Sequence, residues 1–265
     1  MTGRHGNIAA FVLTFDGAGV LRRDSVTRQM RQFRPEISWQ LVSGYGAQDT
    51  ELAQHYDAAL NRKHSKRPLG GGEIAAYAGH RKMMRQFLAT GLPFGLFLED
   101  DFSPLDMNGR WHHLLDHVDG VMGSKDMLKL FDFGPPRTGF VDHETHGPVK
   151  MVKPLSVGAG AVGYVLSRDG ARKILARKRF FRQIDEDIKY FWELDLDIWA
   201  VRPQMISEIS DMLGGSFLKA ERDAIKQSHR SIATSMKGNY LALRKMALNR
   251  IHRYGVAGRT RSRGY

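Results

Sequence analysis

Three consecutive carboxylates, Glu99, Asp100 and Asp101, come directly after the apolar run at residues 94–98. Adjacent carboxylates repel one another unless a cation compensates their charge. A hard divalent cation takes oxygen ligands, and carboxylates together with substrate phosphates are its natural partners. In extended chain Glu99 and Asp101 point to the same side, so they are the candidate metal ligands, while Asp100 points elsewhere, toward a ribose or sugar hydroxyl. The alternative is an acidic turn that caps the next segment.

A second candidate group lies on a predicted helix that follows Gly70-Gly71-Gly72. Glu73, Ala76, Tyr77 and His80 share one face of this helix. Its first turn, at Gly72, offers free backbone N–H groups to an anion. The alternative is a core helix with a hydrogen-bonded histidine.

A third acidic group, Asp185-Glu186-Asp187, opens another predicted helix. Carboxylates favour a helix N-terminus electrostatically, so these residues could be caps. They could equally supply a general base toward a hydroxyl group, in which case Asp185 or Asp187 is the candidate. His229 is a candidate for an additional metal ligand, because it is the only histidine between Asp187 and the late tail.

The pattern of apolar residues and chain breakers predicts the elements that must position these groups. Short apolar runs predict strands, and longer periodic segments predict helices. The predicted strands cover residues 8–15, 37–42, 94–98, 127–133, 149–152, 161–167 and 196–201. The predicted helices cover residues 20–33, 50–60, 73–88, 111–122, 168–178 and 187–193, and residues 134–148 are predicted to form a loop. Such alternation favours an α/β fold with one mostly parallel sheet, at whose carboxyl edge ligands bind.

Charge divides the chain into two parts. Of its 40 basic and 28 acidic residues, 12 Lys or Arg and only 2 Asp or Glu lie in residues 219–265. We therefore predict a catalytic domain at residues 1–215 and a basic extension at residues 216–265, which could meet anionic lipid, nucleic acid or solvent. In the extension, apolar residues gather on one side of a predicted helix. They are Tyr240, Leu243, Ala247, Leu248, Ile251 and Tyr254.

Composition excludes several classes of protein. Hydrophobic residues make up 42% of the 265 residues, which argues against a largely disordered chain. The absence of cysteine excludes a disulfide-stapled mini-protein and leaves the redox compartment undetermined. No apolar run approaches the ~20 residues that span a bilayer, so no transmembrane helix is predicted.

Taken in order, these motifs resemble glycosyltransferase family 25, the lipopolysaccharide-type hexosyltransferases related to collagen galactosyltransferases. The resemblance is carried by Gly72-Glu73-Ile74, His80 and Leu98-Glu99-Asp100-Asp101, and it covers about residues 8–210. Supporting similarities are the strand at 8–15 with Arg22 and Arg23, the segment 163–171, Ile184-Asp185 and the segment 200–203.

The resemblance implies a GT-A-type nucleotide-sugar-binding fold, with a single Rossmann-like, mostly parallel sheet flanked by helices. It implies inverting transfer of a hexose, most often galactose or glucose, from a UDP-sugar to a hydroxyl of a cell-surface glycan such as lipopolysaccharide core. Mn²⁺ or Mg²⁺ would be held by Glu99 and Asp101, and Asp185 or Asp187 would be the base. The expected donor-binding residues are Arg22, Arg23, Gly72, Glu73, His80 and Asp100.

The expected location is the cytoplasm, peripheral on the inner face of the cytoplasmic membrane, with residues 219–265 against anionic lipid. One rival is a nucleic-acid-binding protein that acts through the basic extension, but the nearly neutral body makes a nucleic-acid partner unfavourable. A metal-dependent phosphoryl-transfer enzyme is another, disfavoured by the lack of a Gly-Lys-Ser/Thr loop. A third is a catalytically silent member of the family.

Overall fold

The computed structural model describes residues 6–15, 17, 19–33, 37–105, 109–134, 139–215, 219–229 and 231–261. Eight strands form a central sheet in the order β2-β1-β3-β8-β5-β9-β7-β6, and β4 and β10 form a separate two-stranded sheet. The strands are β1 (Ile8–Thr14), β2 (Trp39–Ser43), β3 (Phe94–Glu99), β4 (Phe102–Pro104), β5 (Met127–Lys129), β6 (Phe140–His146), β7 (Val149–Pro154), β8 (Gly163–Ser167), β9 (Ile198–Val201) and β10 (Ile206–Glu208).

The central sheet is mixed but mostly of one direction, which confirms the predicted α/β class. Strands β1, β2 and β3 pair in parallel, as do β5 and β9. Strand β8 runs antiparallel to both β3 and β5, and β7 runs antiparallel to both β9 and β6. Leu13 of β1 pairs with Glu99 of β3, so the two strands end together at one edge of the sheet. This edge is where an α/β sheet presents ligand-binding groups.

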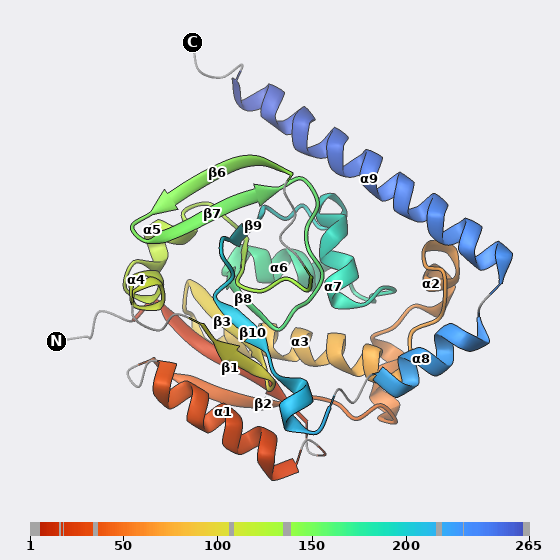
Figure 1. The fold of residues 1–265 in the computed structure, drawn as a ribbon, viewed down its shortest axis with the longest axis horizontal. Coiled ribbons are helices and arrows are strands. Elements are labelled where there is room, and N and C mark those ends of the chain that lie inside the picture. Colours follow the sequence, from red (N-terminus) through yellow and green to blue (C-terminus); the bar gives the residue numbers. More distant parts are fainter. Residues whose placement is uncertain are drawn as a thin grey trace.

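Helices cover both faces of the sheet (Figure 1). The helices are α1 (Gly19–Phe33), α2 (Ala58–His64), α3 (Gly71–Thr90), α4 (Arg110–Asp116), α5 (Val118–Met122), α6 (Arg168–Ala176), α7 (Ile184–Asp187), α8 (Lys219–Ser228) and α9 (Ile232–Arg261), with 3₁₀ turns η2 (Thr50–Gln54), η3 (Ile188–Glu193) and η4 (Ser210–Leu213). One buried cluster joins the sheet to α1, α4 and α5, and a second joins it to α3, α6 and α7. Alternate residues of β1 divide between the two clusters, Ala10 and Val12 on one side and Ala9 and Phe11 on the other. That alternation is the geometry of a strand buried on both faces.

Four sequence predictions of local structure are wrong. The predicted helix at residues 50–60 is instead a 3₁₀ turn, η2, followed by a separate helix, α2, that begins at Ala58. The predicted loop at residues 134–148 contains a strand, β6, which pairs with β7. The predicted helix at 111–122 is broken into α4 and α5 at His117, whose backbone leaves the helical region. The predicted helix at 187–193 begins earlier, at Ile184, and changes to 3₁₀ geometry at Ile188.

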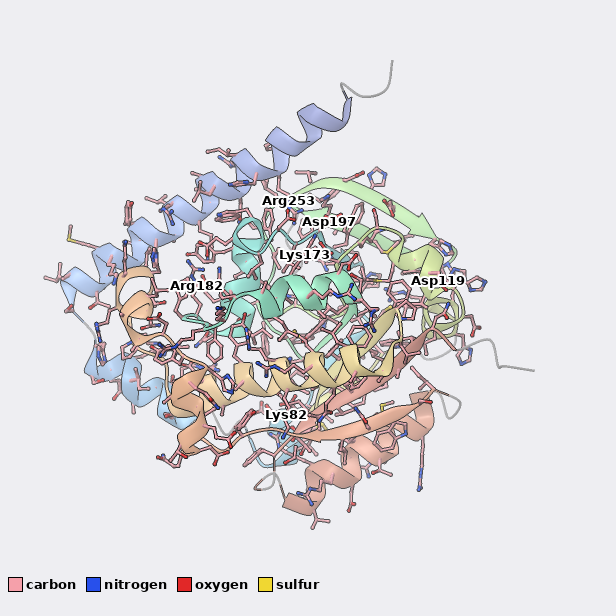
Figure 2. All side chains as sticks on the ribbon, turned by 180° about the vertical axis from the view of Figure 1, so that it is seen from behind. Lys82, Asp119, Lys173, Arg182, Asp197 and Arg253 are labelled. Atoms are coloured by element: carbon pink, nitrogen blue, oxygen red, sulfur yellow. The ribbon has the colours of Figure 1, made fainter. Side chains whose placement is uncertain are left out.

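Helices α8 and α9 belong to the basic extension, and both contact the body. Lys245 of α9 pairs with Glu186, and Asn249 Nδ2 donates to Ser156 Oγ at 3.2 Å. Arg253 is 4% exposed and lies over the Phe191 ring, 3.8 Å from Asp197 Oδ1 (Figure 2). Burial lowers the pKa of Arg253 to about 10, although Asp197 opposes this shift. No helix in the described ranges combines the length and apolarity needed to cross a bilayer.

Candidate functional site

The acidic turn lies at the end of β3 and is held there by Arg22 and Thr14. Arg22 contacts Asp100 Oδ1 directly, and its Nη1 lies 3.5 Å from Asp101 Oδ2. Thr14, the last residue of β1, donates its hydroxyl to Asp100 Oδ2 at 3.3 Å. Arg22 Nη2 also donates to the Gly215 carbonyl at 2.7 Å. One guanidinium group therefore faces two of the three carboxylates.

Asp101 lacks full compensation of its charge. Burial raises its pKa to about 8, and the charges of Glu99 and Asp100 add to the shift, while Arg22 opposes it. Its Oδ1 is buried without a hydrogen-bond partner among the described residues. Burial also raises the pKa of Asp100, despite its contact with Arg22. The turn therefore holds more negative charge than Arg22 neutralises. The described residues contain no group of three or more His, Cys, Asp or Glu arranged to hold a metal ion, so the protein itself would supply only Glu99 and Asp101.

Glu99 is held in position by a buried histidine. His80 of α3 is 0% exposed, and its Nε2 lies 3.1 Å from Glu99 Oε1. Its Nδ1 lies 2.8 Å from the Tyr164 hydroxyl, and the Tyr164 ring stacks on Phe97. Burial raises the pKa of Tyr164, so its hydroxyl stays protonated. His80 thus fixes the Glu99 carboxylate from the protein interior.

Two cavities meet at the acidic turn. Cavity A has a volume of about 220 Å³ and is lined by Thr14, Arg22, Gly72 and the segment 44–47 as well as by the three carboxylates. Cavity B, of about 540 Å³, is lined by residues of α7, α8 and the loop at 159–162. Ala76, Glu99 and Asp101 line both cavities. A ligand in either cavity would therefore reach the same two carboxylates.

The first turn of α3 holds an anion that belongs to the protein itself. Gly71 and Gly72 donate their N–H groups to the two carboxylate oxygens of Glu221 on α8, at 2.8 and 3.1 Å. The N–H group of Gly72, predicted to bind an anion of the donor, is therefore occupied by a side chain of the protein in this structure. Only a backbone without side chains fits here, because a Cβ on Gly71 would lie 2.4 Å from the Ala47 carbonyl oxygen.

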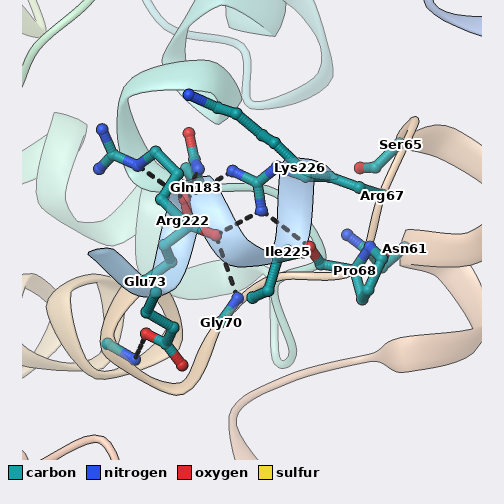
Figure 3. Close-up of polar contacts among 12 residues, drawn as sticks. Asn61, Ser65, Arg67, Pro68, Gly70, Glu73, Gln183, Arg222, Ile225 and Lys226 are labelled. Atoms are coloured by element: carbon teal, nitrogen blue, oxygen red, sulfur yellow. Dashed lines mark hydrogen bonds and ion pairs between the residues drawn. The ribbon is translucent and has the colours of Figure 1, made fainter. Parts of the chain in front are cut away.

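Glu73, the next residue, is locked in an ion-pair network (Figure 3). Arg67 donates to both of its carboxylate oxygens at 2.7 Å, and Arg222 of α8 lies 3.2 Å away. Gln183 and the Gly70 N–H also donate to it. Burial alone would raise the pKa of Glu73, but these bonds bring it below its ordinary value. Glu73 lines cavity B, where it holds α8 in place.

The structure separates the two candidate bases. Asp185 lines cavity B, with its side chain 27% exposed and its Oδ2 3.4 Å from the Gly160 N–H. Asp187 is 0% exposed, accepts from the Tyr77 hydroxyl at 2.7 Å and pairs with Arg177 and Arg182. A base must reach its substrate, so this placement favours Asp185.

Two predicted residues remain. Arg23 is exposed and lines neither cavity, and His229, predicted as an additional metal ligand, also lines neither of the two cavities that contain Glu99 and Asp101. Sequence reasoning missed Thr14, Tyr164 and Glu208. Glu208 of β10 lines cavity B and adds to the raised pKa of Asp101. No local motif marks these residues, since they reach the site only through strand pairing.

Comparisons with known proteins identify the family. Residues 18–188 match the model of glycosyltransferase family 25 (LPS biosynthesis protein). No curated protein matches significantly. The chain has a remote likeness to the crystal structure of A197 from STIV, with 12% identity, a TM-score of 0.37 and coverage of 76% of this chain and 83% of the other. It has a similar likeness to a glycosyltransferase involved in glycosylation of the major capsid of PBCV-1, with 11% identity, a TM-score of 0.40 and coverage of 82% and 97%. On the family match, which spans well over half of its length, the chain belongs to glycosyltransferase family 25 and is a glycosyltransferase.

Proposed function

We propose that the protein transfers a hexose, galactose or glucose, from a UDP-sugar to a hydroxyl of a cell-surface glycan such as lipopolysaccharide core. The observation that carries this proposal is the meeting of cavities A and B at Glu99 and Asp101, where Asp101 Oδ1 has no hydrogen-bond partner among the described residues. A group-transfer enzyme must bring two substrates to one reacting centre. Cavity A would take the donor and cavity B the acceptor.

Glu99 and Asp101 would hold Mn²⁺ or Mg²⁺. The bound cation would neutralise the charge that develops on the diphosphate leaving group. Arg22, which lines cavity A, adds a fixed positive charge on the same side. Asp100 is kept in place by Arg22 and Thr14, so that it can accept from a donor hydroxyl.

Asp185 would accept the proton of the attacking acceptor hydroxyl. It lies in the same cavity as Glu99 and Asp101 and is open to solvent, as an acceptor requires. Lys189 Nζ lies 3.8 Å from Asp185 Oδ2 and places a positive charge beside the carboxylate. One base and one direct displacement invert the configuration at the transferred carbon.

The outward face of α9 would bind the anionic inner face of the cytoplasmic membrane. Seven large apolar residues of α9 are 46–82% exposed. They are Ile232, Met236, Tyr240, Leu243, Met246, Ile251 and Tyr254. Residues 232–261 also carry seven Lys or Arg and no Asp or Glu. An exposed apolar stripe on a basic helix is the pattern of an interfacial helix, and it suits an enzyme whose acceptor is lipid-anchored.

The transferase proposal is tested by UDP release. UDP-galactose, UDP-glucose and UDP-N-acetylhexosamines are incubated with the purified protein in Mn²⁺, Mg²⁺ or EDTA. We expect metal-dependent UDP release from a hexose donor, lost in Asp101→Ala and retained in Asp24→Ala, a control on the exposed side of α1. Absence of binding of every UDP-sugar with either metal would refute the proposal.

The membrane proposal is tested separately, by sedimentation with phosphatidylglycerol vesicles and with neutral phosphatidylcholine vesicles. Wild-type protein should sediment with the anionic vesicles, and Leu243→Glu should not. Equal sedimentation of the two proteins would refute the role of the α9 stripe.

A further inference from the structure

A third cavity, cavity C, opens where α8 and α9 meet the segment before α3. Its volume is about 490 Å³, and its described lining contains no carboxylate. The lining offers cations and neutral hydrogen-bonding groups instead. The cations are Lys66, Arg67 and Lys226, and the other hydrogen-bonding groups belong to His229, Ser231, Thr234, Ser235 and Asn239.

Cavity C contrasts sharply with cavity B, its neighbour. The described lining of cavity B holds seven carboxylates, which are Glu73, Glu99, Asp101, Asp185, Glu208, Asp211 and Asp223, and two cations, Arg222 and Lys226. Lys226 lines both cavities, so they are adjacent. A molecule that extends from cavity B into cavity C passes from an acidic wall to a basic one.

Part of the positive charge of cavity C is not used within the protein. Arg67 is committed to Glu73, and Lys226 lies 3.3 Å from Asp223. Lys66 has no hydrogen-bond or ion-pair partner among the described residues, and it is exposed at the rim. The Nδ1 atom of His229 bonds to Ser228 and to the Ile225 carbonyl, which leaves Nε2 available. Because Nδ1 carries the hydrogen that it donates to the Ile225 carbonyl, Nε2 of the neutral imidazole is an acceptor. Lys66 can therefore donate to a bound anion directly, and His229 can do so in its protonated form.

We infer that cavity C binds an anionic substituent, phosphate or carboxylate, of the acceptor glycan. This inference rests on the proposed function, since it takes cavity B as the acceptor site. The reacting hydroxyl would lie near Asp185, and the anionic group would lie against Lys66 and His229. The hydroxyl and amide groups of Ser231, Thr234 and Asn239 suit the sugar hydroxyls beside that group. The acceptor is thus an acidic sugar chain, selected by charge at a distance from the reacting centre.

The test measures binding of three probes by calorimetry, namely glucose 6-phosphate, glucuronic acid and neutral glucose. The wild type should bind one or both acidic sugars more tightly than glucose, and added salt should weaken that binding. The double variant Lys66→Gln/His229→Asn should lose roughly tenfold or more in affinity for the acidic sugar, because charge-assisted hydrogen bonds are removed. Comparison of the phosphate and the carboxylate probes shows which anion the cavity prefers.

Lys63→Gln is the matched control, because Lys63 is an exposed lysine of α2 outside the lining of cavity C. It should bind the acidic sugar as the wild type does. The inference is overturned if the double variant keeps wild-type affinity, if neither acidic sugar binds better than glucose, or if a single-stranded oligonucleotide binds more tightly than both. Affinity for UDP with Mn²⁺ is measured in the same samples. Failure of the wild type to bind UDP would refute the proposed function alone, whereas loss of acidic-sugar binding with intact UDP binding bears on cavity C alone.

Discussion

Replacing Asp101 by asparagine is expected to make the metal-free protein more stable. The folded protein raises the pKa of the Asp101 carboxyl from 3.8 to about 8, because the group is buried and lies beside Glu99 and Asp100. A carboxyl whose pKa rises on folding binds more protons in the folded than in the unfolded state. It therefore costs no stability below pH 3.8, and the cost grows as the pH rises toward 8.

The magnitude follows from the same shift. About three pH units separate the ordinary pKa from neutrality, and each unit is worth about 1.4 kcal/mol, which gives a cost of about 4 kcal/mol at pH 7. The asparagine amide also needs partners in this buried position, which takes back part of the gain. We expect Asp101→Asn to raise the free energy of unfolding by about 2–4 kcal/mol at pH 7, with no gain at pH 4.

Urea unfolding in EDTA at pH 4, 7 and 8 measures this difference, with Asp24→Asn as the exposed control of equal charge change. Adding Mn²⁺ should then stabilise the wild type and leave Asp101→Asn unchanged, because a ligand stabilises only the state that binds it. The reasoning is refuted if Asp101→Asn is no more stable than the wild type in EDTA at both pH 7 and pH 8.

Three further predictions concern the carboxylates around the cavities. Asp185→Asn should lower the rate of hexose transfer by about 10²–10⁴-fold and leave the UDP-sugar Kd unchanged, as judged by calorimetry beside kinetics; an unchanged rate would exclude Asp185 as the base. Asp187→Asn should destabilise the fold by about 1.5–3 kcal/mol in urea, because Arg177 and Arg182 lose one of their two counter-charges and keep only Glu193; wild-type stability would contradict this structural role. Glu221→Gln should loosen α8 from the first turn of α3, so trypsin should cleave faster at Arg222 and Lys226. Mass spectrometry measures the cleavage rate, with Asp223→Asn as the control variant. Equal cleavage rates of the two variants would count against the contact.

Much of the fold could be predicted from the sequence, because its strands are buried on both faces. The strands that carry the site, β1, β3 and β8, are short apolar runs with clear breakers, and their positions are confirmed within a few residues. Strand β6 could not be recognised, because only its pairing with β7 makes a strand of the polar run at residues 140–146. The break at His117 is likewise set by packing and not by a local signal.

The candidate site could be predicted only where neighbouring residues act together. Glu99, Asp100 and Asp101 are adjacent in sequence, so their mutual repulsion could be inferred directly. The partners of these carboxylates come from 19 or more positions away, as His80 and Thr14 show. Asp185 and Asp187 lie on the same short helix, so the sequence does not show which of them faces the cavity. In the structure Asp185 lines cavity B and Asp187 is buried. The α3 turn is a similar case, because Glu221 lies about 150 positions from the glycines whose N–H groups it binds.

Helix α9 is also a long, continuous element of the structure. A 30-residue α-helix is about 45 Å long, and α9 has this length in one continuous segment. Contacts at Lys237 near its beginning and at Arg253 near its end fasten one side of this rod to the body. The opposite side carries the exposed apolar stripe, while the first turns close cavity C. One continuous helix therefore carries both the exposed apolar stripe and part of the wall of cavity C, so the surface that faces outward and the cavity are built on the same element.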